Sequence, residues 1–153
     1  MLTALHLLGT RSNFQFSALV LNFGCYDMSF LPQARNFHRS PRLMLDLEIM
    51  EHFLAAFCPG MTPEERRKPS ISPFFQDLSG LKLPPALFTC GTEDCMLDDS
   101  VMMAVRWQMT GTETILKFFA GSPHGFILFD PAKVDNARDV DKVIQQFLIE
   151  KLG

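Results

Sequence analysis

The sequence lacks the marks of a nucleic-acid-binding or membrane-spanning protein. Its 153 residues hold 14 Lys and Arg against 17 Asp and Glu, a net charge of −3, and no basic block. A protein that binds phosphate backbones needs a basic surface, so we expect no nucleic-acid partner. No apolar run approaches the roughly 20 residues that a membrane-spanning helix needs. We therefore expect no membrane span either.

Signals for targeting and for metal binding are also lacking. The N-terminal stretch MLTALHLLGT has no basic region and no small-residue cleavage site, so we predict no signal peptide and expect a cytoplasmic protein. The closest cysteines, Cys90 and Cys95, are not spaced like zinc ligands. His6, His38 and His52 show no ligand spacing. We expect reduced thiols, no metal and no cofactor.

Apolar residues are plentiful, at 47% against 20% charged. That proportion is typical of globular proteins, and the length predicts one domain, residues 1–153, with a real core. The chain holds 15 Phe and 9 Met but one Tyr and one Trp. Most of these side chains should pack in the core, and some are suited to lining an apolar pocket.

Three apolar runs predict buried strands: residues 16–23 (FSALVLNF), 86–90 (ALFTC) and 114–119 (TILKFF). Nearly continuous apolar runs are typical of parallel strands covered on both faces. Residues 31–43 and 68–85 are predicted to be irregular. Helices are predicted over residues 2–8, 45–57, 98–109 and within 131–152, with a further helix start at Thr62. Strands alternating with helices indicate an α/β fold with a parallel sheet.

The apolar positions on these helices predict which faces are inward. They are Leu47, Met50, Phe53, Leu54 and Phe57 on the second helix, Val101, Met102, Val105 and Met109 on the helix over 98–109, and Val140, Val143, Ile144, Phe147 and Leu148 on the last.

Two residues are placed like an acid and a base. Asp94 follows the second predicted strand and His124 follows the third. Sites in open parallel sheets form just beyond the carboxyl ends of the strands, so the two side chains could meet there. A histidine held by a buried carboxylate is the base of a nucleophilic triad. The alternative is structural, because an Asp in such a loop is often a helix cap, and we expect Asp98 or Asp99 to be one.

Around these residues the sequence resembles the hormone-sensitive-lipase-like α/β-hydrolases, the fold-3 family of carboxylesterases and lipases. The resemblance lies in PALFTCGTEDCMLDD at residues 85–99, in His-Gly-Phe at 124–126, in Pro-Ser-Ile-Ser-Pro at 69–73 and in the opening Leu-Thr-Ala-Leu. It implies that Asp94 and His124 are the acid and base of a Ser-His-Asp triad that hydrolyses carboxylic esters of small molecules. It further implies that the three strands are the last three of the family sheet, so the chain is the C-terminal part of an α/β-hydrolase fold. Met96 and Phe126, which flank the acid and the base, are then candidates for contact with substrate, with packing an equal explanation.

The departures from the family pattern bear on activity. No Gly-x-Ser-x-Gly occurs in the sequence, and neither does a His-Gly-Gly oxyanion loop. Cys25 ends the first predicted strand but is not on a nucleophile elbow, so a buried thiol is the better reading. Without a nucleophile and oxyanion donors, we expect the chain alone to be inactive.

The first predicted strand gives a second hypothesis from a different class. In the family, residues 16–23 would pair with a further strand that this sequence does not supply. An open apolar edge invites pairing with another chain, so self-association through residues 16–23 is expected. The chain could therefore be a non-catalytic binding module that acts through this edge. An in-frame Gly-x-Ser-x-Gly-coding segment upstream of the Met1 codon would favour the enzyme reading.

Overall fold

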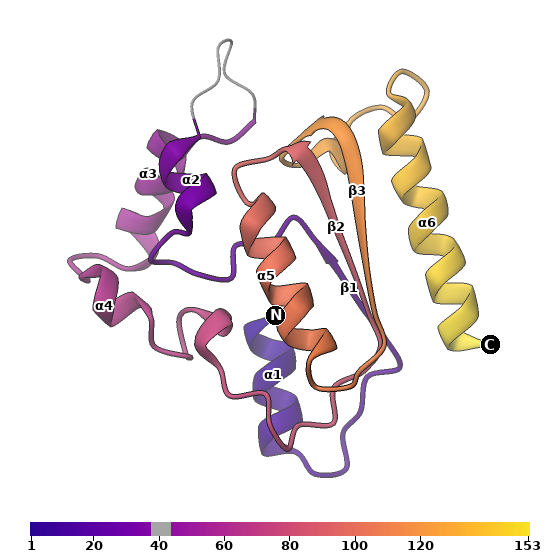
Figure 1. Cartoon of the computed structure of the whole chain (residues 1–153), viewed down its shortest axis with the longest axis horizontal. Helices are drawn as coiled ribbons and strands as arrows, with labels where there is room; N and C mark the ends of the chain where they lie inside the picture. Colours follow the sequence, from indigo (N-terminus) through magenta and orange to yellow (C-terminus); the bar gives the residue numbers. More distant parts are fainter. Residues whose placement is uncertain (38–43) are drawn as a thin grey trace.

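The computed structural model describes residues 1–37 and 44–153. His38 and the end of the predicted 31–43 loop lie outside the described residues. Helices and strands alternate along the chain (Figure 1). The elements are α1 Leu2–Thr10, β1 Leu19–Asn22, α2 Pro32–Asn36, α3 Leu47–Phe57, α4 Pro63–Arg66, β2 Ala86–Glu93, α5 Leu97–Gln108, β3 Thr114–Pro123 and α6 Asp135–Leu152, with 3-10 turns at Pro73–Phe75 and Phe126–Leu128.

The three strands form one parallel sheet in the order β1-β2-β3, as predicted. Leu19 pairs with Ala86 in β2, and Ala86 pairs in turn with Thr114 in β3. Helices α5 and α6 lie on opposite sides of the sheet (Figure 1). The side chain of Phe88 packs with Trp107 of α5, while Phe119 packs with Val140 of α6. The central strand β2 is therefore covered on both faces, which explains its continuous apolar run.

The strand lengths differ from the prediction for a backbone reason. β1 covers only residues 19–22 of the predicted 16–23, because β2 begins at Ala86 after two prolines and the N–H of Leu19 is already bonded to the carbonyl of Pro85. Residues 16–18 therefore have no residues of β2 opposite them to pair with. β2 and β3 extend beyond their predicted ends, to Glu93 and Pro123, because they pair with each other past the end of β1.

The predicted inward face of α5 is wrong. Met102, Val105 and Met109 are exposed, Met109 to 80%. The helix instead buries Asp99, Ser100, Met103, Ala104 and Trp107 against the sheet and the loop after β1. Trp107 decides this orientation, because its ring packs on Phe88 and its indole N–H donates to the carbonyl of Pro84 at 3.0 Å. A buried Trp needs such a partner for its N–H.

The segments before and after α3 are more regular than predicted. Within the predicted 31–43 loop, residues 32–36 form α2, which begins with Pro32. The N–H of Gln33 donates to a carboxylate oxygen of Asp98, which ties α2 to α5. Asp46 caps α3 by accepting from the N–H of Ile49 at 3.0 Å. The predicted helix start at Thr62 is confirmed, with a complete capping box.

Two of the five apolar positions predicted to face inward on α3 do not pack in a core. Met50 and Leu54 are buried, while Phe53 and Phe57 are 68% and 61% exposed. The predicted inward face of α6 agrees better with the structure, since Val140 and Phe147 are buried and Val143 and Ile144 pack against the same cluster as Val140.

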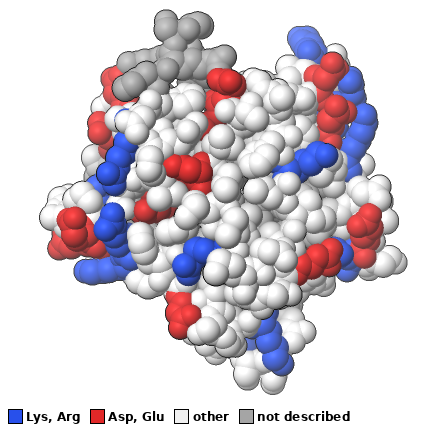
Figure 2. Space-filling view, viewed as in Figure 1, with Lys and Arg blue, Asp and Glu red and all other residues white. Residues whose placement is uncertain are grey.

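The surface carries no block of one charge on the face shown. Lys, Arg, Asp and Glu side chains are interspersed, with broad uncharged areas between them (Figure 2). Among the described helices, none is long and apolar enough to cross a membrane.

Candidate active site

Asp94 follows β2 directly and is completely buried. One carboxylate oxygen accepts from the backbone N–H of Met96 at 2.8 Å. The other faces the thiol of Cys90 at 3.6 Å. These contacts and the burial fix the carboxylate in one orientation, with its oxygens toward the end of β3.

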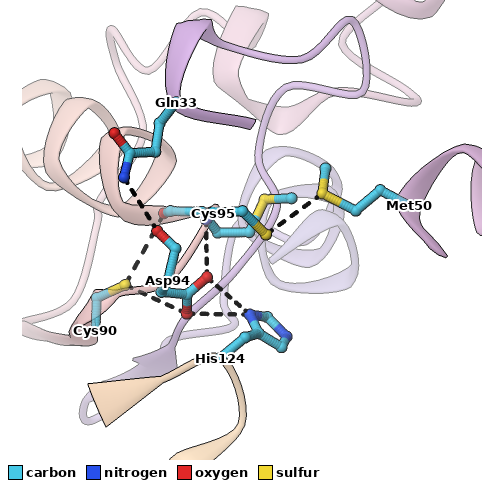
Figure 3. Close-up of polar contacts among 7 residues, drawn as sticks. Gln33, Met50, Cys90, Asp94, Cys95 and His124 are labelled. Carbon is cyan, nitrogen blue, oxygen red and sulfur yellow. Dashed lines mark hydrogen bonds and ion pairs between the residues drawn. The ribbon is translucent and has the colours of Figure 1, made fainter. Parts of the chain in front are cut away.

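His124 follows β3, and its ring meets that carboxylate. Nδ1 lies 3.1 Å and 3.0 Å from the two oxygens of Asp94 (Figure 3). In the tautomer with its proton on Nδ1, the ring donates this hydrogen bond to the carboxylate. Nε2 is then the basic nitrogen, and the side chain is 25% exposed. The structure thus brings the two sequence-predicted residues into direct contact.

A local irregularity in the sheet brings His124 to Asp94. The β2–β3 register is regular up to Gly91 opposite Phe119, and then shifts so that Glu93 faces Pro123. β3 therefore has extra residues in this stretch, as in a bulge beside an active site. The N–H of Gly121, which has φ +72°, donates to the hydroxyl of Thr92 at 2.8 Å.

The bulge is held from both sides. A Cβ on Gly91 would lie 2.0 Å from the carbonyl oxygen of Ser122, so the two strands touch there only because residue 91 has no side chain. On the other side Asn136 of α6 donates to the Ser122 hydroxyl at 2.7 Å and to the carbonyl of Ala120 at 2.9 Å. His124 is two residues after Ser122, so these contacts help to position its ring.

Phe23, the residue that follows β1, packs on the ring of His124. The two ring centroids are 4.9 Å apart in an edge-to-face arrangement. Phe23 adopts a left-handed backbone conformation, with φ +38°, which a bulky residue adopts only where its surroundings hold it. Its ring in turn packs on Phe126 at 6.3 Å. The residue after β1 thus contributes an aromatic contact to the site that the sequence did not predict, because the φ value of Phe23 could not be read from the sequence.

A cavity of about 450 Å³ opens beside His124. Its wall is mostly carbon and sulfur, and it explains the exposed aromatic residues of α3. The lining side chains are Asn22, Phe23, Cys25, Met28, Phe30, Leu45, Met50, Phe53, Leu54, Phe57, Met96 and His124.

The two predicted substrate contacts differ in position. Met96 lines the cavity. Phe126 is fully buried against Phe119 and Val140 and is not among the lining residues. The structure places Phe126 behind Phe23, where it packs rather than faces the cavity, because the 3-10 turn after His124 directs it into the core.

Cys25 lines the cavity but has the wrong electrostatics for a nucleophile. Burial, and then the charges of Asp99 and Asp27, raise the pKa of its thiol far above the ordinary range. The thiol therefore stays protonated at neutral pH, and the side chain is half-buried rather than buried as expected.

Asp98 and Asp99 do not cap α5 with their side chains, contrary to prediction; the N-cap is Met96. Asp99 instead accepts from the backbone N–H groups of Tyr26 and Asp27 at 2.6 Å and 2.8 Å, which ties the loop after β1 to α5. Burial raises the pKa of Asp99 to about 7. No spacing rule could have found this pair of contacts, which join residues more than 70 positions apart.

Within the described part of the chain, no three His, Cys, Asp or Glu side chains are grouped as metal ligands.

Comparison with known proteins identifies the fold. The sequence pattern of the alpha/beta hydrolase fold family matches residues 1–128. An esterase of Acinetobacter venetianus is 25% identical over 118 residues, which are 74% of this chain and 36% of that esterase. Carboxyl esterase 2 of Tuber melanosporum superposes with a TM-score of 0.85 at 20% identity, over 99% of this chain and 50% of the esterase. A hormone-sensitive lipase from a metagenome library gives 0.84 at 23% identity, over 98% and 49% of the two chains.

The chain thus spans about a third of its curated relative and about half of each solved structure. The predicted resemblance to hormone-sensitive-lipase-like esterases and the prediction of a partial α/β-hydrolase fold, with three parallel strands flanked by helices, are both confirmed. The chain belongs to the alpha/beta hydrolase fold family.

Proposed function

We propose that this chain supplies the acid, the base and part of the substrate cavity of a serine carboxylic ester hydrolase. The observation that supports this most is the Asp94–His124 pair, with a buried carboxylate on Nδ1 and a half-buried ring at the edge of an apolar cavity. A structural ion pair would not need the histidine ring to border a cavity.

In the proposed mechanism, Nε2 of His124 takes the proton of a serine hydroxyl as that oxygen attacks the ester carbonyl. Asp94 holds the imidazole in the tautomer with its proton on Nδ1 and stabilises the imidazolium that forms. His124 then returns the proton to the leaving alcohol, and a second cycle with water releases the acid. Phe23 packs on the ring and restrains its rotation.

The nucleophile and the oxyanion donors are proposed to come from a segment outside these 153 residues, since the sequence holds no Gly-x-Ser-x-Gly. The strand-to-helix turn of that motif exposes the serine. Removing one oxyanion donor alone costs roughly 3–4 kcal/mol in the transition state. The chain alone is therefore expected to show no esterase turnover.

The cavity favours an uncharged, apolar part of an ester. Phe53, Phe57 and Leu54 of α3 line it together with Met96, the N-cap of α5. Its volume of about 450 Å³ is within the usual range for small-molecule sites. None of the described residues that line it is an Asp, Glu, Lys or Arg. Short to medium acyl chains fit this wall better than charged acids.

The non-catalytic alternative rests on β1. It is at the edge of the described sheet, and its four residues are only half-buried. Pairing of this edge with a second copy would give a self-associating module. Sedimentation tests whether the chain associates, and calorimetry tests how sharply it melts. A monomer that melts sharply would argue against such pairing.

The acid–base pair can be tested on the chain itself by proton NMR. A hydrogen bond from Nδ1 to a carboxylate moves that ring proton strongly downfield, so we expect such a resonance in the wild-type chain and its loss in Asp94→Asn. Asp98→Asn is the matched control, since Asp98 contacts Gln33 rather than His124. Retention of the resonance in Asp94→Asn would contradict the proposed pair.

Turnover is tested separately with a p-nitrophenyl butyrate assay. The wild-type chain and His124→Ala should give the same background rate. A rate that His124→Ala abolishes would show that a nucleophile lies within these 153 residues and would overturn that part of the proposal.

A further inference from the structure

The wall of the cavity holds a polar residue that the proposed mechanism does not use. Asn22 is the last residue of β1, and its side chain lines the cavity together with that of His124. The other described side chains of the wall are aromatic, aliphatic or sulfur-containing. Among the described lining residues, Asn22 is therefore the only one with an amide.

The backbone fixes the position of Asn22. It pairs with Thr89 of β2 in the parallel register, and the N–H of the next residue, Phe23, donates to the Thr89 carbonyl at 2.7 Å. Phe23 then turns the chain out of the strand, with φ +38°. A functional side chain at the end of a regular strand is held more precisely than one in a loop.

One hydrogen bond orients the side chain of Asn22. Thr89 is fully buried, and its hydroxyl donates to Oδ1 of Asn22 at 2.5 Å. The oxygen and the NH₂ group are on different arms of an amide, so anchoring Oδ1 toward Thr89 directs Nδ2 away from it. Among the described residues, none accepts a hydrogen bond from Nδ2. Asn22 thus keeps its two N–H donors for a partner in the cavity.

We propose that Asn22 is a specificity-determining residue, which donates from Nδ2 to an uncharged carbonyl oxygen on the part of the ester that occupies the cavity. Because the cavity is taken as the ester site, this role of Asn22 rests on the proposed function. In that mechanism His124 serves the serine and the leaving alcohol, and the oxyanion donors serve the reacting carbonyl. A further carbonyl oxygen is the acceptor left for Nδ2. The favoured substrates are therefore oxo-substituted esters rather than esters of plain hydrocarbon chains.

The apolar wall gives this single amide its effect. An oxygen that moves from water into an apolar cavity loses its hydrogen bonds, and a protein donor restores one of them. Small-molecule sites commonly combine a largely apolar lining with a few polar groups that fix the orientation of the ligand. A neutral amide suits a neutral carbonyl, and no described lining residue is a Lys or Arg that would favour a carboxylate.

The competing explanation is purely structural. The hydrogen bond between Asn22 and Thr89 would then only close the end of β1 on β2, and Nδ2 would be hydrated. The amide protons distinguish the two explanations, since they respond to a carbonyl oxygen in the cavity only if Nδ2 donates to it.

The test is an NMR titration of the purified chain with two probes of the same shape. Cyclohexanone carries a carbonyl oxygen, and methylenecyclohexane has a CH₂ group in its place. We expect both probes to shift the ring resonances of His124, and cyclohexanone alone to shift the side-chain amide resonances of Asn22. In Asn22→Leu, affinity for the ketone should fall about 10-fold, while affinity for the alkene should stay within about 2-fold.

A second variant keeps the test decisive if Asn22→Leu does not fold. Asn22→Leu leaves the buried Thr89 hydroxyl without its acceptor, whereas Asn22→Leu/Thr89→Val replaces both partners by apolar groups of similar shape, which is nearly neutral for stability. The double variant should lose the same ketone affinity. Met28→Leu is the matched control in the wall, and it should change both affinities equally, within about 2-fold.

Two results would overturn the role of Asn22 and leave the proposed function standing. One is equal weakening of both probes in Asn22→Leu and in the double variant. The other is an unmoved Asn22 amide while cyclohexanone shifts the ring of His124. If neither probe shifts the His124 ring, the cavity is not a small-molecule site beside the base, and the proposed function fails together with the role of Asn22.

Discussion

Gly91→Ala should separate the end of β3 from β2 and take His124 away from Asp94. The new Cβ would lie 2.0 Å from the Ser122 carbonyl oxygen, where ordinary contacts begin at 3.4 Å, so the strands must part by more than about 1 Å. His124 is two residues beyond Ser122, and its 3.0 Å hydrogen bond would not survive a shift of that size.

The expected cost combines two terms. Overpacking a close contact costs about 1–3 kcal/mol, and a lost charge-assisted hydrogen bond about 1.5–3 kcal/mol. Because the strands can relax partly, we expect the free energy of unfolding to fall by about 2–4 kcal/mol. Urea denaturation followed by circular dichroism, at one low chain concentration, measures this loss. The downfield His124 proton should disappear in the same variant.

Gly9→Ala is the matched control. Its Cβ would meet only Leu81, at 3.9 Å, and it lies in α1, where Ala is favoured over Gly by up to about 1 kcal/mol. The reasoning is refuted if Gly91→Ala keeps the urea midpoint of the wild type, or if it loses stability while the His124 resonance remains.

Three further predictions concern the scaffold of the site. Trp107→Ala should lower the free energy of unfolding by about 3–5 kcal/mol, since the ring is fully buried, whereas Met109→Ala on the exposed face should change it by less than about 0.5 kcal/mol, as urea denaturation will show. Asp46→Ala removes the cap of α3 and should cost about 1 kcal/mol in the same measurement, with Glu51→Ala on the exposed side of α3 as its control. Asp99 has a pKa of about 7 in the folded chain against 3.8 for an ordinary Asp, so the folded state binds the extra proton and wild-type stability falls as pH rises from about 4 to about 7, by on the order of 2–4 kcal/mol. Asp99→Asn should remove that fall, because its amide oxygen can still accept from Tyr26 and Asp27; an unchanged pH slope between pH 4 and 8 would contradict the assignment.

The meeting of Asp94 and His124 was predictable from the sequence because their positions depend on short-range features. Asp94 and His124 each follow an apolar strand, and parallel strands place their carboxyl ends at one edge. The parallel sheet was predictable from the alternation of strands and helices, whereas the strand order was implied by the family resemblance. Local residue patterns of this kind can be read from the sequence without knowledge of contacts between distant segments.

The errors came from contacts between distant segments. The inward face of α5 is set by the packing of Trp107 on β2 and by the hydrogen bonds of Asp99 to the loop after β1. The spacing of apolar residues along α5 predicts neither contact. Phe126 was expected at the cavity because it is two residues from His124, but it is fully buried against Phe119 and Val140. Sequence adjacency is a poor guide to direction within a turn.

The geometry of the acid–base pair depends on little beyond β2, β3 and the helix that follows. Gly91 allows the strands to touch, Thr92 holds the bulge and Asn136 of α6 braces it from behind. Phe23, the residue after β1, also packs on the His124 ring. The contact between the His124 ring and its carboxylate is therefore held by residues inside this chain, whereas the sequence holds no Gly-x-Ser-x-Gly segment. In the proposed function, the orientation of the base and the supply of the nucleophile are thus separable properties, because different segments provide them.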